Sequence, residues 1–145
     1  MRTTRVIVGS LVAVGFGLLM AGPVWAHHAF AAEFDANRPF KIEGTVKEVE
    51  WTNPHVWFHI NVKGPDGQIE EWKIEGGGPG SLTRRGFTKT YLPVGTEIVV
   101  EGFLSKGVPH RGNGRVMTFR DGRTLFVGSS GTGAPTDGND PSDKK

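Results

Sequence analysis

The sequence predicts an all-β fold: a small, OB-like five- to six-stranded Greek-key barrel with one short helix. Residues 55–62 alternate between polar and apolar side chains, as a half-buried strand does. Residues 64–67 read Gly-Pro-Asp-Gly, a turn that can reverse the chain into a second strand. The predicted order is three strands, a short helix and two or three further strands. That order fits an OB barrel, and a plain β-sandwich is the alternative.

The chain has 145 residues and begins with a pattern typical of an export signal. Arg2 and Arg5 precede an almost unbroken apolar run over residues 6–22, and small residues follow. This layout predicts a cleaved signal peptide over residues 1–26, and hence a periplasmic protein with no membrane span after cleavage. The alternatives are an uncleaved anchor, since the apolar segment could just cross a bilayer, and a second cut after Ala31.

Removal of the signal would leave a chain without net charge. The full sequence has 17 Lys and Arg against 15 Asp and Glu, and loss of Arg2 and Arg5 leaves 15 of each sign. Nucleic acids are bound through an excess of clustered Lys and Arg. Because the mature chain would have no excess of Lys and Arg, we expect no nucleic-acid partner. The chain has no Cys, which excludes disulfides, thiolate metal sites and Cys nucleophiles.

Residues 27–40 are predicted to form an N-terminal arm, followed by the barrel domain over residues 41–128. The first predicted strand covers residues 41–51. Its alternation breaks between Val46 and Val49, which indicates a β-bulge.

The second and third strands are predicted to form a hairpin. A three-residue loop fixes their register, and apolar residues then face one another across the two strands. The predicted pairs are Gly64 with Gln68, Ile60 with Trp72, Phe58 with Ile74, and Val56 with Gly76.

The remaining elements follow a glycine-rich turn at residues 76–80. The sequence predicts a short helix at residues 81–85 and strands at residues 96–104, 115–119 and 124–127, the last two joined by Asp121-Gly122. Residues 129–145 consist almost entirely of small and polar residues, which predicts a disordered tail.

A Trp-Thr-Asn-Pro-His run at residues 51–55 is the most specific motif of the chain. Shorter matching segments lie at residues 27–30, 72–77, 84–88, 94–98 and 121–123. Over roughly residues 27–128, this set resembles a family of small exported bacterial proteins known only as a domain of unknown function. The resemblance implies export and a similar fold, and it assigns no catalytic residue.

The histidines suggest a metal site. A cut after Ala26 would make His27 the first residue, and its amine and imidazole could chelate one Cu(II) in a near-planar site. This arrangement resembles the N-termini of periplasmic copper carriers and copper-dependent polysaccharide oxidases. His28, His55 and His110 are the other candidate ligands. The alternative is that His27 and His28 form a solvated stub.

His55 and His59 cannot readily share a metal, because four residues along a strand separate their Cα atoms by about 13 Å. We therefore expect His59 to be an outward residue beside Lys73. His55 follows Asn53-Pro54, which indicates a rigid turn at the start of a strand.

Trp57 is predicted to point outward and to lie opposite Glu75, on the strand 2–3 face that OB barrels use for ligands. Cover by the N-terminal segment or the tail is the alternative. The leading hypothesis is a periplasmic, non-enzymatic binding protein for Cu(II). The second is a metal-free adaptor that binds a peptide, a glycan, a small ligand or an exported partner on this face, and an enzyme is the third. The candidate ligand-binding residues are Trp57, Glu75, Trp51, Asn53 and Arg85.

Overall fold

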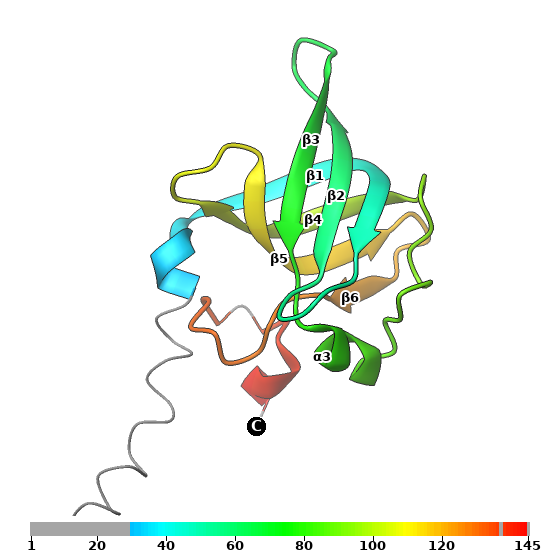
Figure 1. The fold of residues 1–145 in the computed structure, drawn as a ribbon. Coiled ribbons are helices and arrows are strands. Elements are labelled where there is room, and N and C mark those ends of the chain that lie inside the picture. The colour runs from blue at the N-terminus through cyan, green and yellow to red at the C-terminus, as the bar shows by residue number, and fades with distance from the viewer. Residues whose placement is uncertain (1–29, 137, 145) are drawn as a thin grey trace, which may run out of the picture.

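A computed structural model describes residues 30–136 and 138–144 (Figure 1). The predicted signal peptide, His27 and His28 lie outside the described residues. After a helical turn at residues 30–33, the elements are β1 (Phe34–Glu50), β2 (Trp57–Lys63), β3 (Ile69–Glu75), α3 (Pro79–Arg84), β4 (Glu97–Ser105), β5 (Arg111–Phe119), β6 (Thr124–Phe126) and the 3-10 helix η1 (Pro141–Lys144).

The strands form one six-stranded sheet in the order β3-β2-β1-β4-β5-β6. Neighbours in this order are antiparallel, and β3 also pairs with β5 in parallel, which closes the sheet into a barrel. The helix α3 lies between β3 and β4 in the chain, at one end of the barrel (Figure 1). This topology confirms the predicted OB-like Greek-key barrel with one short helix.

The hairpin register is confirmed by the structure. Phe58 pairs with Ile74 and Ile60 with Trp72, and the amide of Gly64 donates to the carbonyl of Gln68 over 2.8 Å. The irregularity in β1 also lies where the alternation breaks, because its pairing with β2 shifts just after Val46.

Two strands are longer than the sequence predicts. β1 begins at Phe34 rather than Lys41, and β5 begins at Arg111 rather than Arg115. The added part of β1 pairs with β4, and the added part of β5 pairs with β3 and β4. Because these partner strands are distant in sequence, the local alternation of polar and apolar side chains does not reveal that the strands are extended.

The core fills the barrel and its helix-covered end. Phe58 is fully buried on β2, and Phe87, after α3, packs edge-on against it with ring centroids 5.7 Å apart. Gly102 on β4 allows close contact with β5, because a Cβ there would lie 2.0 Å from the carbonyl oxygen of Asn113. The two paired strands therefore approach closely at Asn113, which lies on β5.

The segment after residue 128, for which composition predicts disorder, makes polar contacts with the barrel. Arg85 donates to Ser130 Oγ over 2.9 Å, and Arg115 donates to the Pro135 carbonyl over 3.3 Å. Asp140 is buried and accepts hydrogen bonds from Ser130 and Ser142. Within the described part of the chain, no helix is long and apolar enough to cross a membrane.

Candidate functional site

A pocket of about 250 Å³ lies where the helical turn at residues 30–33, the loop before β2 and the paired ends of β3 and β5 meet. We call it the His55 pocket. It has an apolar wall of two phenylalanines and a proline, and a polar wall that includes two carboxylates, an imidazole and an amide. Its lining residues are Phe30, Glu33, Phe34, Pro54, His55, Glu75, Asn113 and Thr132.

His55 is placed by the loop before β2, which contains the cis Asn53–Pro54 bond. Its Nδ1 lies 3.2 Å from the carbonyl oxygen of Gly76. A carbonyl only accepts hydrogen bonds, so this contact favours the tautomer with the ring proton on Nδ1 and the lone pair on Nε2. In the neutral ring, Nε2 is therefore the nitrogen that can bind a metal.

Glu75 lies next to His55, with Oε1 3.9 Å from the histidine Nδ1. Asn113 Nδ2 donates to the same oxygen over 3.3 Å. Burial raises the pKa of the Glu75 carboxyl, and the nearby Glu33 adds to this, whereas His55, Asn113 and Arg111 act in the opposite direction. The effect of burial outweighs that of these neighbours, so the net direction of the Glu75 pKa is upward.

Glu75→Gln is expected to stabilise the fold at pH 7. The raised pKa means that the folded state holds the Glu75 proton more tightly than the unfolded state. Its contribution to stability is therefore full below the unfolded pKa, for which the ordinary value is 4.5, and is lost as pH rises through the folded pKa. Thermal melts of variant and wild type should diverge, with the variant more stable, as pH rises from 4 to 7.

Glu71→Gln is the matched control on the same strand. Hydrogen bonds from Lys47 and then from His59 lower the pKa of Glu71. Its contribution is present above the unfolded pKa and is lost on acidification, so the pH trend has the opposite sign. Parallel pH trends for the two variants would contradict the assignment of Glu75 as a carboxyl destabilised by burial.

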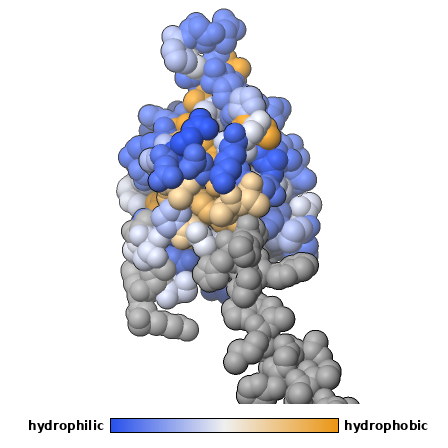
Figure 2. All heavy atoms as spheres, turned by 90° about the vertical axis from the view of Figure 1, so that its left-hand side faces the viewer, coloured by the Kyte–Doolittle hydropathy of each residue, from blue (hydrophilic) through white to orange (hydrophobic). Residues whose placement is uncertain are grey.

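The apolar wall holds the first described residues in place. Phe30 is buried against Phe34 and Phe103, with ring centroids 5.6 and 5.7 Å away. Glu33 accepts a hydrogen bond from Arg111 over 2.9 Å. Figure 2 shows a small apolar area on this side of the molecule, bordered by hydrophilic side chains. The chain therefore enters the described fold directly at the His55 pocket.

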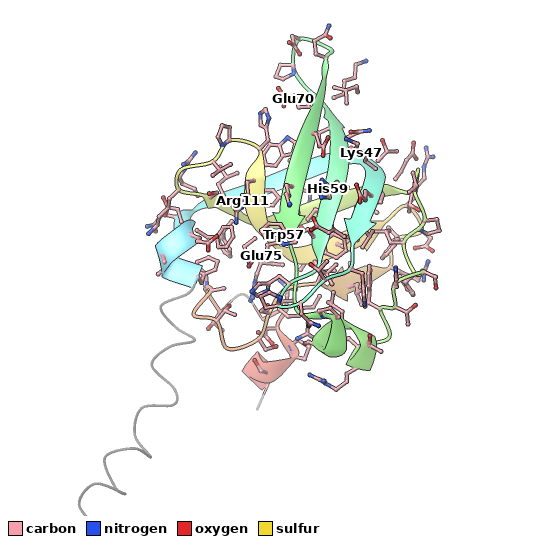
Figure 3. All side chains as sticks on the ribbon, in the orientation of Figure 1. Lys47, Trp57, His59, Glu70, Glu75 and Arg111 are labelled. Carbon is pink, nitrogen blue, oxygen red and sulfur yellow. The ribbon has the colours of Figure 1, made fainter. Side chains whose placement is uncertain are left out.

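Trp57 lies on the outer face of β2, opposite Glu75 in the register, as predicted. Figure 3 shows both side chains near the same end of the barrel, with Arg111 beside them. The Trp57 ring is contacted by Lys73 Nζ at 4.9 Å and by the Arg111 guanidinium at 4.8 Å from its centroid. The Trp57 ring thus makes cation–π contacts with two positively charged side chains.

Of the five predicted ligand-binding residues, only Glu75 lines the pocket, and Trp51, Asn53 and Arg85 lie outside it as Trp57 does. Trp51 stacks on Phe87, with ring centroids 6.2 Å apart, and covers the core. Asn53 is exposed in the loop before β2, next to Pro54, which does line the pocket. Arg85 follows α3 and donates to the carbonyl of Gly128 over 2.7 Å.

His110 is also outside the pocket lining. Its ring stacks on Trp72 at 5.3 Å, and its Nε2 lies 3.4 Å from Glu70. Trp72 precedes Glu75 by three strand positions, about 10 Å, so His110 and His55 are not brought together. Among residues 30–136 and 138–144, no three His, Asp or Glu side chains form a metal-binding group.

His59 lies opposite Lys73 on the outer face, as predicted. Its two ring nitrogens face different carboxylates, Glu71 at 2.9 Å and Glu50 at 3.4 Å. These carboxylates lie on opposite sides of the ring, so they do not converge on one metal position.

Sequence reasoning missed Asn113, Glu33 and the phenylalanines of the apolar wall. Asn113 stands between Gly112 and Gly114, and all three residues are buried. A single polar residue between two glycines of a strand was the available signal for a close backbone approach.

Comparisons with known proteins add a family match. The sequence profile described as "Family of unknown function (DUF6152)" matches residues 17–114. No curated protein matches the chain. A solved structure similar to this chain is the mitochondrial single-stranded DNA binding protein Rim1 of S. cerevisiae, with 18% identity, a TM-score of 0.38, and coverage of 63% of this chain and 83% of that one.

Proposed function

The chain belongs to DUF6152, a family of unknown function, and we propose from its own residues that it is an exported, non-enzymatic protein that binds Cu(II). The proposed ligands are the amine and imidazole of a mature N-terminal His27, together with Nε2 of His55. The observation that carries the proposal is that Phe30 and His55 line the same pocket.

Chain geometry supports this proposal. An extended chain spans at most about 3.6 Å per residue, so the Cα of His27 lies no more than roughly 11 Å from that of Phe30. A chain that began at His27 would therefore start within reach of the His55 pocket. By the same limit, the Cα of His28 can be at most roughly 7 Å from that of Phe30, so His28 is a further candidate ligand.

The proposed donor set suits Cu(II). An amine and two neutral imidazoles are nitrogen ligands, which favour the tetragonal geometry of Cu(II). Each donor must lose its proton to bind, so affinity should fall on acidification. Glu33 and Glu75, which also line the pocket, would add negative charge near the cation.

Export is the first requirement of the proposal. We expect the protein isolated from the periplasm to have the intact mass of a chain that starts at His27, because the signal pattern ends at Ala26. A mass that corresponds to a start at Ala32 would exclude the site, since that chain lacks both His27 and His28.

His55→Ala is expected to weaken Cu(II) binding by about tenfold or more and to change the copper electron paramagnetic resonance spectrum, because it removes a ligand. The measurement is a copper titration of protein that starts at His27. His59→Ala is the matched control, since His59 lies on the outer face with both nitrogens engaged. Equal losses in the two variants would contradict a site at His55.

A metal-free adaptor remains the second candidate. The Trp57 ring carries Lys73 and Arg111, so this face offers an aromatic residue with two cations to a partner. Lys73 is already paired with Glu50, at 3.3 Å, and Arg111 with Glu33, at 2.9 Å. A partner would have to compete with both ion pairs, which is why we place this function second.

A further inference from the structure

Two oxygen atoms lie close to one nitrogen of His55, and a buried amide donates a hydrogen bond to one of these oxygens. The carbonyl oxygen of Gly76 is 3.2 Å from Nδ1, and Glu75 Oε1 is 3.9 Å from the same atom. Asn113 Nδ2 donates to that carboxylate oxygen over 3.3 Å. Among the residues that the structure describes, none makes a comparable contact with the other ring nitrogen, Nε2.

We infer that Glu75 and Asn113 are positioning residues that hold the His55 ring with Nε2 presented as its metal-binding nitrogen. This inference rests on the proposed function. Histidine ligands commonly donate their second ring N–H to a carboxylate or a carbonyl, which fixes the tautomer and the ring orientation. Here the carbonyl of Gly76 accepts that proton, and the Glu75 carboxylate stabilises it from the same side.

The burial of Glu75 and Asn113 supports a role for these two residues beyond packing. Asn113 is 3% exposed and Glu75 is 9% exposed. A buried carboxyl and amide cost free energy unless their hydrogen bonds are satisfied, so apolar residues would serve better if packing were their only role. The two residues come from different strands and are direct partners in the parallel β3–β5 pairing.

Glu75 could instead be a metal ligand itself. Its oxygen lies on the Nδ1 side of the imidazole, whereas a metal on Nε2 would lie on the other side of the ring. A residue that acts through His55 and a residue that binds the metal directly differ in one respect. Only the direct ligand keeps its effect when His55 is absent.

The first test uses the metal-free mature protein. Nitrogen-15 NMR of the imidazole should show His55 as the Nδ1–H tautomer in the wild type and as a mixture of tautomers in Glu75→Gln. Asn113→Leu should give a smaller change in the same direction. Glu71→Gln, which removes a carboxylate beside His59 on the same strand, should leave His55 unchanged. An Nε2–H tautomer in the wild type would overturn the inference.

The second test is a double-mutant cycle with Cu(II). Glu75→Gln is expected to weaken binding about 10- to 100-fold in the wild-type background, which is the usual effect of losing an outer-shell partner. It should have almost no effect in the His55→Ala background. An equal loss in both backgrounds would make Glu75 a direct ligand and overturn the positioning role.

The two proposals fail separately. A protein that binds no Cu(II), but whose Nδ1–H tautomer is lost in Glu75→Gln, would contradict the proposed function and support the positioning role. A protein that binds Cu(II) at His27 and His55, with the same tautomer in the wild type and in Glu75→Gln, would support the function and overturn the positioning role.

Discussion

Phe58→Ala is expected to lower the free energy of unfolding by about 3–5 kcal/mol, the usual cost of truncating a buried aromatic residue. The Phe58 side chain is fully buried and packs against Phe87. It also lies beside Gly76, where a Cβ would come within 2.7 Å of its ring. Urea melts of the wild type and the variant measure the difference.

Trp57→Ala is the matched control for Phe58→Ala, one position along the same strand. Trp57 is only partly buried and loses mainly its contacts with Lys73 and Arg111, each worth about 0.5–1 kcal/mol at exposed sites. A larger loss of stability in Trp57→Ala than in Phe58→Ala would show that the two faces of β2 are exchanged.

One residue added before His27 is expected to abolish the amine–imidazole chelate. The extension moves the terminal amine away from the His27 imidazole, so two donors no longer bind as one unit. We expect Cu(II) affinity to fall by more than the roughly 10- to 100-fold that outer-shell changes cause, because a ligand itself is lost. Copper titrations of the two purified forms give the comparison.

A chain extended by the same residue at its C-terminus controls for the added mass and handling. It should bind Cu(II) as the native form does. If the N-terminally extended and native chains bind Cu(II) equally well, the N-terminal site is wrong. The adaptor function on the Trp57 face would then be the better proposal.

Much of the barrel could be predicted where its contacts are local. The β2–β3 hairpin has a recognisable turn and clear alternation, so the pairing of Phe58 with Ile74 followed from counting residues. The start of β1 at Phe34 could not be predicted, because that segment is mostly polar and becomes a strand only through its pairing with β4.

The candidate site was predictable in part for the same reason. His55 and Glu75 belong to the hairpin region, and the structure places them together. Asn113 reaches them through the parallel pairing of β3 with β5, which no local pattern reveals. His110 was a reasonable candidate by residue type, but its stacking on Trp72 depends on the tertiary fold.

The parallel closure of the barrel has a kinetic consequence. Asn113 and Glu75 meet across 38 residues of sequence, whereas the β2–β3 hairpin is closed by the short loop at residues 64–67. Long-range contacts raise the contact order and slow folding, because a long loop must lose its entropy before they form. The β2–β3 hairpin, with His55 just before it in the chain, can thus form before Asn113 of β5 reaches Glu75. A metal that binds only the completed pocket would shift the folding equilibrium toward the closed barrel.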